Sequence, residues 1–224
     1  SHQNLAKSYE DGWQDDLITP FKGLERDNNM RGDSTLEKLA TLKPCFGGPD
    51  GTMTPANSTP LTDGASTVLL ATEEWAKERG LPVLAYLTIG EAAAVDFIGK
   101  KEGLLMAPAY AVPSMLDKLD LTLQDFDFYE IHEAFASQVL STLKAWEDET
   151  FCKEKLGRKK ALGSIDRSKL NVKGSSLAAG HPFAATGGRI IANAAKLLNE
   201  KGSGRALISV CAAGGQGVVA ILEK

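Results

Sequence analysis

ALISVCAAGGQGVVAIL, residues 206–222, is the stretch that decides the fold. Two apolar runs, Ala206–Val210 and Val218–Leu222, lie on either side of a turn rich in glycine. Apolar runs that follow each other so closely predict the two strands of a hairpin. We therefore expect a hairpin at the end of a buried sheet.

Further strands and helices alternate ahead of this hairpin. Val83–Ile89 and Phe126–Ile131 are rich in strand-forming residues, and Tyr110–Leu119 predicts a helix that opens around Pro113. The alternation predicts an α/β fold built in layers, a mixed sheet with helices. Two longer amphipathic helices are indicated by apolar residues at helical spacing, namely Phe135, Val139, Leu143 and Trp146 in the first and Ile190, Ile191, Ala194, Leu197 and Leu198 in the second.

The first third of the chain has a different composition. Residues 1–60 are polar and rich in turn formers, which is typical of an excursion from a core. Within them, Ser34–Glu37 fits a capping box in front of a short helix. Farther on, Val68–Ala71 predicts a buried strand or helix segment, and Glu73–Arg79 predicts a helix closed by Gly80.

Composition and charge exclude some classes of protein. The chain has 224 residues, 43% of them hydrophobic, so it can form a sizeable core and is not of the disordered class. Its net charge of −4 gives no electrostatic reason to expect nucleic acid. No apolar stretch approaches the roughly 20 residues of a membrane span. A short basic run fits either a local patch or an ordinary solvated loop: Lys155, Arg158, Lys159 and Lys160.

The cysteines and the first residues indicate the setting. Cys45, Cys152 and Cys211 form no CxxC pair and cannot all be paired, which favours a reducing compartment, the cytoplasm or, in a eukaryote, the mitochondrial matrix. The chain starts without Met and without a signal peptide. That start predicts a fragment or a processed chain.

The first candidate site is AGHPFAATGG, residues 179–188. His181 lies between glycine and proline on a tight turn, and small residues lead from it into the second long helix. An imidazole beside a helix N-terminus can act as a general base or donate to a developing oxyanion. The alternative is a histidine that makes one structural hydrogen bond in a loop.

The second candidate site is VCAAGGQG, residues 210–217. Cys211 ends an apolar strand, and the small residues after it allow the backbone to approach a ligand closely. A thiol in that place can serve as a nucleophile or exchange a proton. The alternative is a small buried residue beside a hairpin turn.

The third candidate site is EIHEAFA, residues 130–136, which places His132 and Glu133 where a strand gives way to a helix. Polar side chains at the C-terminal end of a strand commonly face a crevice in α/β folds. An HExxH zinc site is excluded because no second histidine stands at the required spacing. The alternative is a solvated pair that caps the helix.

The motifs HEAFA, GHPFAATG and CAAGGQG, in this order and spacing, resemble the thiolase family. Upstream, LATLKPCF (residues 39–46), DGTMTPANS (50–58) and DGA (63–65) are similar to the exit of that family's loop domain. The resemblance covers essentially the whole chain. It matches only the C-terminal half of a thiolase, so the N-terminal half with its nucleophilic cysteine is expected to be missing.

The resemblance implies a role for each matching position. His181 corresponds to the histidine that activates the nucleophile and helps form an oxyanion hole, and Cys211 to the acid/base cysteine. Ala213 corresponds to a second backbone oxyanion donor. His132 stands where most thiolases have Asn, a departure that is similar to the thiolase subunits of fatty-acid β-oxidation complexes. Three positions correspond to contacts with coenzyme A or the acyl chain: Ser58, Thr59 and Phe135.

As a function, the resemblance implies an acyltransferase, the C-terminal part of a 3-ketoacyl-CoA thiolase (acetyl-CoA C-acyltransferase), active in fatty-acid β-oxidation and lipid metabolism. Coenzyme A is then a substrate, and no metal or other cofactor is expected. The implied partners are acyl-CoA, the missing N-terminal half, further copies of the parent chain and a hydratase/dehydrogenase subunit. Two alternatives stay open, a biosynthetic acetyl-CoA acetyltransferase and a non-catalytic CoA-binding half.

The same resemblance predicts three parts of the chain. Residues 1–60 belong to the loop domain, residues 61–95 complete the N-terminal core, and residues 96–224 form the C-terminal domain. Cys45 and Cys152 correspond to no catalytic position. The isolated chain is therefore expected to be inactive.

Overall fold

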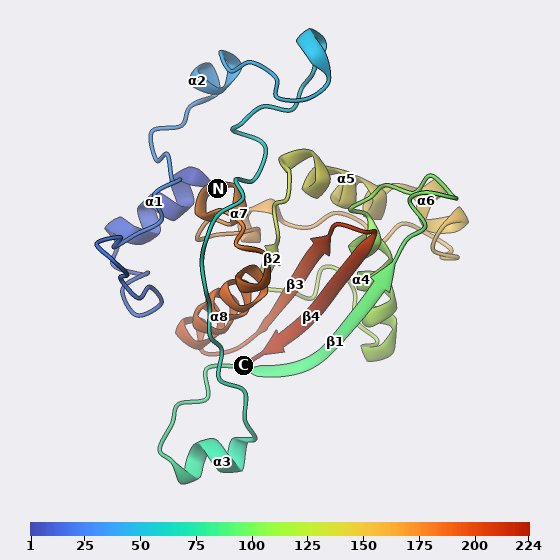
Figure 1. The fold of residues 1–224 in the computed structure, drawn as a ribbon. Helices are drawn as coiled ribbons and strands as arrows, with labels where there is room; N and C mark the ends of the chain where they lie inside the picture. Colours follow the sequence, from blue (N-terminus) through green and yellow to red (C-terminus); the bar gives the residue numbers. More distant parts are fainter.

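A computed structural model describes residues 1–224. At its centre lies a four-stranded mixed sheet with the strand order β1-β4-β3-β2 (Figure 1). Strand β3 runs antiparallel to β4 and parallel to β2, so the C-terminal ends of β2 and β3 meet at one end of the sheet. The strands are β1 (Tyr86–Ala94), β2 (Phe128–Ile131), β3 (Arg205–Ala212) and β4 (Gln216–Glu223).

Helices cover both faces of this sheet. Strand side chains alternate between faces, and Leu207 joins the buried cluster made with α4 (Ala107–Leu119) and α5 (Ala136–Glu147). Its neighbour Ile208 joins the second cluster, made with α8 (Phe183–Lys201). The predicted layered α/β fold, the terminal hairpin and both long amphipathic helices are therefore confirmed.

The remaining helices are short. No helix in the structure has the length and apolar character needed to span a membrane. The predicted helix before Gly80 is present as α3 (Glu73–Glu78). The short elements are α1 (His2–Glu10), α2 (Leu36–Ala40), α3 (Glu73–Glu78), α6 (Glu149–Glu154), α7 (Ser176–Ala179) and two single 3₁₀ turns (Gly48–Asp50 and Arg167–Lys169).

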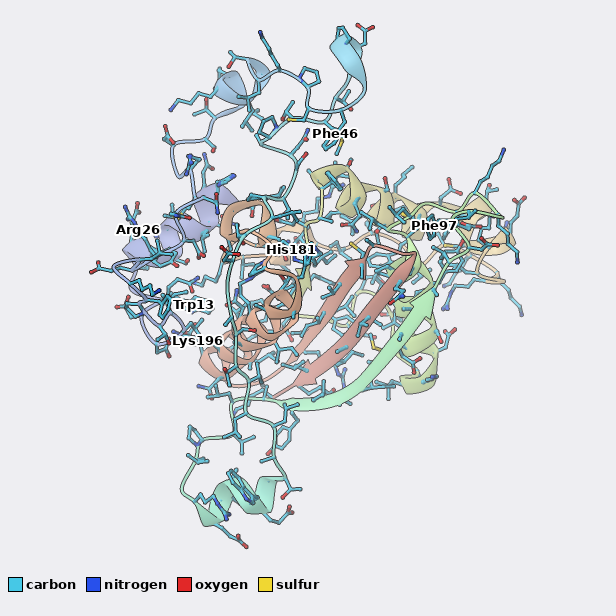
Figure 2. The ribbon with its side chains drawn as sticks, viewed as in Figure 1. Trp13, Arg26, Phe46, Phe97, His181 and Lys196 are labelled. Atoms are coloured by element: carbon cyan, nitrogen blue, oxygen red, sulfur yellow. The ribbon has the colours of Figure 1, made fainter.

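Trp13 joins the first third of the chain to α8. Its indole Nε1 donates to Glu200 Oε2 at 2.8 Å. The Lys196 ammonium lies 4.7 Å from the centre of the Trp13 ring and donates to the Trp13 carbonyl at 2.6 Å, and Figure 2 shows the two residues side by side. A cation over an indole contributes on the order of 1 kcal/mol, so this contact holds α1 and its loop against the domain.

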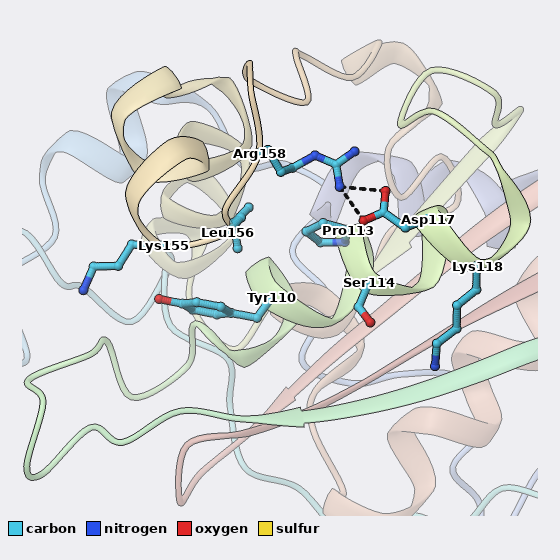
Figure 3. Close-up of a pocket in the computed structure, with 8 residues that line it drawn as sticks. All are labelled: Tyr110, Pro113, Ser114, Asp117, Lys118, Lys155, Leu156 and Arg158. Atoms are coloured by element: carbon cyan, nitrogen blue, oxygen red, sulfur yellow. Dashed lines mark hydrogen bonds and ion pairs between the residues drawn. The ribbon is translucent and has the colours of Figure 1, made fainter.

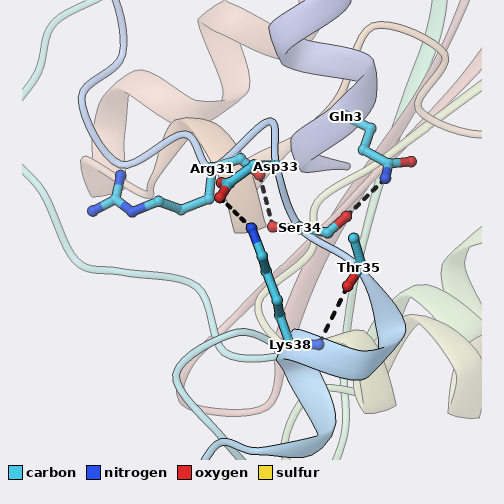
Figure 4. A network of polar contacts seen from close by, with 6 residues as sticks. All are labelled: Gln3, Arg31, Asp33, Ser34, Thr35 and Lys38. Atoms are coloured by element: carbon cyan, nitrogen blue, oxygen red, sulfur yellow. Dashed lines mark hydrogen bonds and ion pairs between the residues drawn. The ribbon is translucent and has the colours of Figure 1, made fainter.

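A second polar network joins α1 to α2 (Figure 4). Gln3 Nε2 donates to the Ser34 carbonyl at 2.7 Å, and Lys38 Nζ pairs with Asp33. The expected capping box on Ser34 is wrong by one residue, because Thr35 is the N-cap and its Oγ1 accepts from the Lys38 N–H at 3.3 Å. The Ser34 hydroxyl donates instead to the Arg31 carbonyl at 2.7 Å and closes the preceding turn.

Two expectations about the middle of the chain need correction. Val68–Ala71 forms neither strand nor helix, and Leu69 and Leu70 are 68% and 64% exposed. The segment lies over α8, where Ser66 Oγ donates to the Ala185 carbonyl at 2.7 Å (Figure 1). The strand expected at Val83–Ile89 begins at Tyr86 and continues to Ala94. The pairing with the whole of β4 sets the length of this strand. The local composition does not predict that length.

Helix α4 begins earlier than Tyr110 because Pro108 occupies its first turn, where the missing N–H costs nothing. Pro113 lies inside the helix instead of opening it. A proline there leaves the carbonyl four residues before it without a helical partner. That carbonyl belongs to Ala109, and it accepts from Trp146 Nε1 of α5 at 3.3 Å. The tertiary contact makes the internal proline tolerable.

Candidate active site

The site lies at the end of the sheet where β2 and β3 finish together. His132 directly follows β2, and its N–H donates to the Ser209 carbonyl of β3 at 2.8 Å. The parallel ladder therefore continues through His132 and fixes its backbone. His132 is only 1% exposed, so it is not the solvated capping residue of the alternative interpretation.

The turn before α8 brings His181 to the same place. Gly180 has φ of +89°, and a Cβ there would lie 2.7 Å from Thr62 Oγ1, so only glycine fits. The His181 N–H donates to the Pro60 carbonyl at 2.9 Å, and Leu61 forms a bridge with His181. A segment from the first third of the chain therefore holds the histidine turn from outside.

The two imidazoles lie against each other. Their ring centres are 4.2 Å apart and the planes are tilted by 42°. Each Nδ1 contacts a hydroxyl: His132 Nδ1 is 2.7 Å from Ser176 Oγ, and His181 Nδ1 is 2.6 Å from Thr186 Oγ1. Figure 2 places His181 near α7, at the N-terminal end of α8. The pair predicted from separate motifs is thus assembled in space.

Both histidines are held neutral. Burial, the neighbouring His181 and the Arg189 cation lower the pKa of His132 from 6.5 to about 3. Burial and Arg189 also lower the pKa of His181. Neutral imidazoles can accept a proton or donate a hydrogen bond, which suits general-base and oxyanion-binding roles.

Glu133 stabilises the site without entering it. Its carboxylate accepts from Ser1 Oγ at 2.8 Å, from Asn171 Nδ2 at 2.9 Å and from the Leu177 N–H of α7 at 3.1 Å. Asn171, held at φ +48°, also hydrogen-bonds both backbone groups of Ile131 at 2.9 Å. The carboxylate therefore caps α7 and ties it to the end of β2.

Cys211 lies on β3, two residues beyond the carbonyl that binds His132. It is 3% exposed, and burial raises the pKa of its thiol to about 12. Its cross-strand partner is Gly217, and a Cβ on Gly217 would meet the Pro108 ring of α4 at 2.7 Å. The thiol therefore stays protonated at neutral pH, which suits a proton donor better than a nucleophile.

Ala213 lies in the turn after β3 and is exposed. The backbone φ of Ala213 is negative. This conformation is the one that lets alanine stand in for glycine as a backbone donor. The oxyanion role of its N–H stays a prediction.

The expected coenzyme A and acyl contacts lie around the turn between β2 and α5. Ser58 forms a bridge with Phe135, and the Phe135 ring meets Phe46 edge-on at 6.4 Å between centres. Thr59 Oγ1 donates to the Glu133 carbonyl at 2.5 Å, so this hydroxyl is already used inside the chain. Ligand contacts by Ser58, Thr59 and Phe135 stay predictions.

The other singled-out residues lie elsewhere. Cys45 is exposed and Cys152 is buried. Lys155 pairs with Glu102 at 2.7 Å and Arg158 with Asp117 at 2.8 Å, so much of the basic run is neutralised. Lys155, Arg158 and Asp117 line a pocket of about 490 Å³ between α4 and the end of α6 (Figure 3). The pocket contains no residue of the histidine site.

Three polar residues of the site were not predicted from the sequence: Ser176, Thr186 and Arg189. Arg189 Nη2 donates to Ser176 Oγ at 2.9 Å, and Thr186 is buried. The sequence contained a signal for two of these residues in its helical spacing. Thr186 stands four residues before the buried Ile190, and Arg189 stands four residues before the buried Asn193. Polar residues that continue a buried helical stripe are rare without a partner.

Comparisons with known proteins agree with this geometry. Residues 81–224 match the family model described as thiolase, C-terminal domain, and residues 1–74 match thiolase, N-terminal domain. The 3-ketoacyl-CoA thiolases of Yersinia pestis (strain Pestoides F) and Yersinia pseudotuberculosis (serotype O:1b) are each 45% identical over 229 residues, covering 100% of this chain and 52% of their own length. The chain thus spans about half the length of these relatives.

Two solved structures have the same fold. The acetyl-CoA acetyltransferase of Bacillus anthracis matches with a TM-score of 0.79 and 35% identity, over 100% of this chain and 53% of that one. The dimeric peroxisomal thiolase of Saccharomyces cerevisiae matches with a TM-score of 0.81 and 33% identity, over 100% and 52%. The division into residues 1–60, 61–95 and 96–224 stays a prediction. By its family-model matches, its relatives and its fold, the chain belongs to the thiolase family.

Proposed function

We propose that this chain is the C-terminal part of a 3-ketoacyl-CoA thiolase, an acetyl-CoA C-acyltransferase. The enzyme cleaves 3-ketoacyl-CoA with free coenzyme A to acetyl-CoA and a shortened acyl-CoA. The observation that carries the proposal is the contact of His132 with His181 beside the end of the strand that holds Cys211. The names of the 45% identical relatives support the same activity.

The chemistry divides between this chain and a nucleophilic cysteine outside it. That thiolate attacks the 3-keto carbonyl carbon, and the bond between the α and β carbons then breaks. The acetyl-CoA enolate takes a proton at its α carbon from the Cys211 thiol, which is protonated because its pKa is about 12. Coenzyme A next attacks the acyl-enzyme thioester carbonyl, its thiol proton passes to the protein, and the nucleophile leaves as the shortened acyl-CoA forms.

The neutral imidazoles supply the polar environment. His181 activates the nucleophile and donates to an oxyanion, and His132 stabilises the enolate oxygen either directly or through a water. The Ala213 N–H is a donor in a second oxyanion hole. Coenzyme A is a substrate of the reaction. No further cofactor is required, because the thioester itself acidifies the α carbon.

The setting of the enzyme is also a proposal. The chain works with the part of the thiolase N-terminal half that it does not itself contain, in a homo-oligomer and beside a hydratase/dehydrogenase subunit of fatty-acid β-oxidation. The Saccharomyces cerevisiae relative is described as dimeric, which supports the oligomer. The reduced cysteines favour the cytoplasm or the mitochondrial matrix.

The test is a substrate comparison with the full-length protein that contains this chain. A long 3-ketoacyl-CoA and acetoacetyl-CoA are each supplied with coenzyme A, and acetyl-CoA release is followed. The proposal expects the higher kcat/KM for the long substrate. Higher activity with acetoacetyl-CoA favours the biosynthetic alternative, which the Bacillus anthracis structure represents. Absence of both activities contradicts the proposal.

A further inference from the structure

The two adjacent histidines contact different hydroxyl groups, and the difference bears on their protons. A serine or threonine hydroxyl has one hydrogen to donate and can accept two. His132 Nδ1 meets Ser176 Oγ at 2.7 Å, and His181 Nδ1 meets Thr186 Oγ1 at 2.6 Å. In each pair, either the hydroxyl donates to the ring or the ring donates to the hydroxyl.

Ser176 already accepts one hydrogen bond, from Arg189. The guanidinium Nη2 donates to Ser176 Oγ at 2.9 Å, and a guanidinium accepts nothing. Ser176 is fully buried and is the first residue of α7, so no preceding helical turn offers it a carbonyl. His132 Nδ1 is the acceptor that remains for the hydroxyl proton. The opposite arrangement leaves that proton buried and unpaired, which is unfavourable.

The charge of Arg189 depends on burial and on nearby acidic groups. Burial disfavours its charge, while Glu130, Glu133 and Asp27 favour the charge. The same cation disfavours a second proton on His132. Arg189 therefore acts on His132 through Ser176 and also through space.

Thr186 has no such constraint. Its Oγ1 makes one hydrogen bond, the contact with His181. Thr186 lies in the first turn of α8, after Pro182, and helical threonines commonly donate to the carbonyl three or four residues before them. The Thr186 hydroxyl can therefore accept from His181 or donate to it.

We propose that Ser176 and Arg189 are positioning residues that hold His132 in the tautomer with its proton on Nε2, whereas Thr186 allows His181 to change protonation. His132 Nε2 makes no hydrogen bond inside the chain, so its N–H is directed to a ligand. His132 is then a permanent hydrogen-bond donor, and His181 is the imidazole that carries a proton during the reaction. The choice of a thioester or enolate oxygen as the acceptor rests on the proposed function, while the tautomer does not.

The tautomer is measured directly by NMR on the full 224-residue chain labelled with ¹⁵N at histidine. Long-range ¹H–¹⁵N correlations distinguish protonated from unprotonated ring nitrogens. The chain has three histidines, and the His2→Gln variant assigns one of them. Between pH 6 and 9 we expect His132 to show a protonated Nε2 and an unprotonated Nδ1 throughout. A protonated Nδ1 on His132, or an averaged pair of nitrogens, overturns the proposal.

Variants then test the cause. Ser176→Ala and Arg189→Gln are expected to give His132 mixed tautomers, the first because the donor is lost and the second because the amide oxygen accepts the serine proton. Ser176→Thr restores the single tautomer, and Thr186→Val changes the signals of His181 alone. Unchanged His132 nitrogens in a folded Ser176→Ala variant overturn the role of Ser176. In the full-length enzyme, Ser176→Ala lowers kcat by up to about 10²–10³-fold, with KM little changed. If the wild type has no thiolase activity but the tautomer is as expected, the proposed function fails and the positioning role stands.

Discussion

The imidazole rings of His132 and His181 lie 4.2 Å apart, although 48 residues separate them in the sequence. One ring is placed by a parallel strand ladder and the other by a glycine turn held from outside by the Pro60 carbonyl. Two unrelated local structures therefore converge on one polar site. Substitutions of either residue separate chemical from structural roles.

His132→Asn tests which function of the imidazole matters. We expect this variant of the full-length enzyme to keep much of its thiolysis rate, because an amide can also hold a water or donate to an oxyanion. His132→Ala is expected to lose more, a transition-state term of roughly 1–3 kcal/mol. The measurement is kcat/KM for both variants. Equal losses would show that the amide does not replace the imidazole and would contradict this prediction.

Glu130→Gln tests the buried carboxyl beside Arg189. Glu130 is 0% exposed, neither oxygen makes a hydrogen bond to another protein group, and burial raises its pKa from 4.5 to about 8. A raised pKa means that its contribution to stability is complete below pH 4.5 and is lost as the pH rises to about 8.

The neutral glutamine variant should therefore gain stability over the wild type across that window, by up to about 1.4 kcal/mol per pH unit. Urea unfolding at several pH values measures the difference. A difference that does not change with pH would mean that Glu130 is ionised and paired with Arg189 in the folded chain.

Gly217→Ala tests the packing behind Cys211. The added methyl group would lie 2.7 Å from the Pro108 ring and 2.9 Å from the Pro108 nitrogen, so α4 must shift. We expect a loss of about 1–3 kcal/mol in the free energy of unfolding. The matched control is Gly187→Ala in α8, where nothing lies within 4 Å, and helix propensity predicts a gain of up to about 1 kcal/mol. Equal effects of the two changes would contradict the close contact.

Cys211→Ala tests the division of labour between the two steps of the reaction. Positioned acid/base groups contribute about 10²–10⁴-fold, and we expect such a loss in carbon–carbon cleavage. Acyl transfer to the nucleophile should be slowed less, because His181 serves that step. Rapid-quench measurements with 3-ketoacyl-CoA and with acyl-CoA compare the two. Equal slowing of both would indicate a structural role for Cys211.

Periodicity and turn chemistry predicted the elements whose pattern lies within their own stretch of sequence. The terminal hairpin, α5 and α8 follow from apolar spacing alone, and the histidine and cysteine motifs marked the places where strands end. Other features depend on distant partners. Pro113 fits inside α4 only because Trp146 takes the freed carbonyl, and Leu69 and Leu70 are apolar without being buried in this structure. The contacts of Ser176 with Arg189 and His132 join three separate segments, which no local window contains.

The assignment of Cys211 as acid/base and not as nucleophile is the central claim. The most direct test exposes the full-length protein to acetyl-CoA, quenches it with acid and maps the acylated cysteine by mass spectrometry of its peptides. We predict no acetyl group on Cys45, Cys152 or Cys211, and a thioester on a cysteine outside residues 1–224. An acetyl thioester on Cys211 that turns over with added coenzyme A would contradict this account.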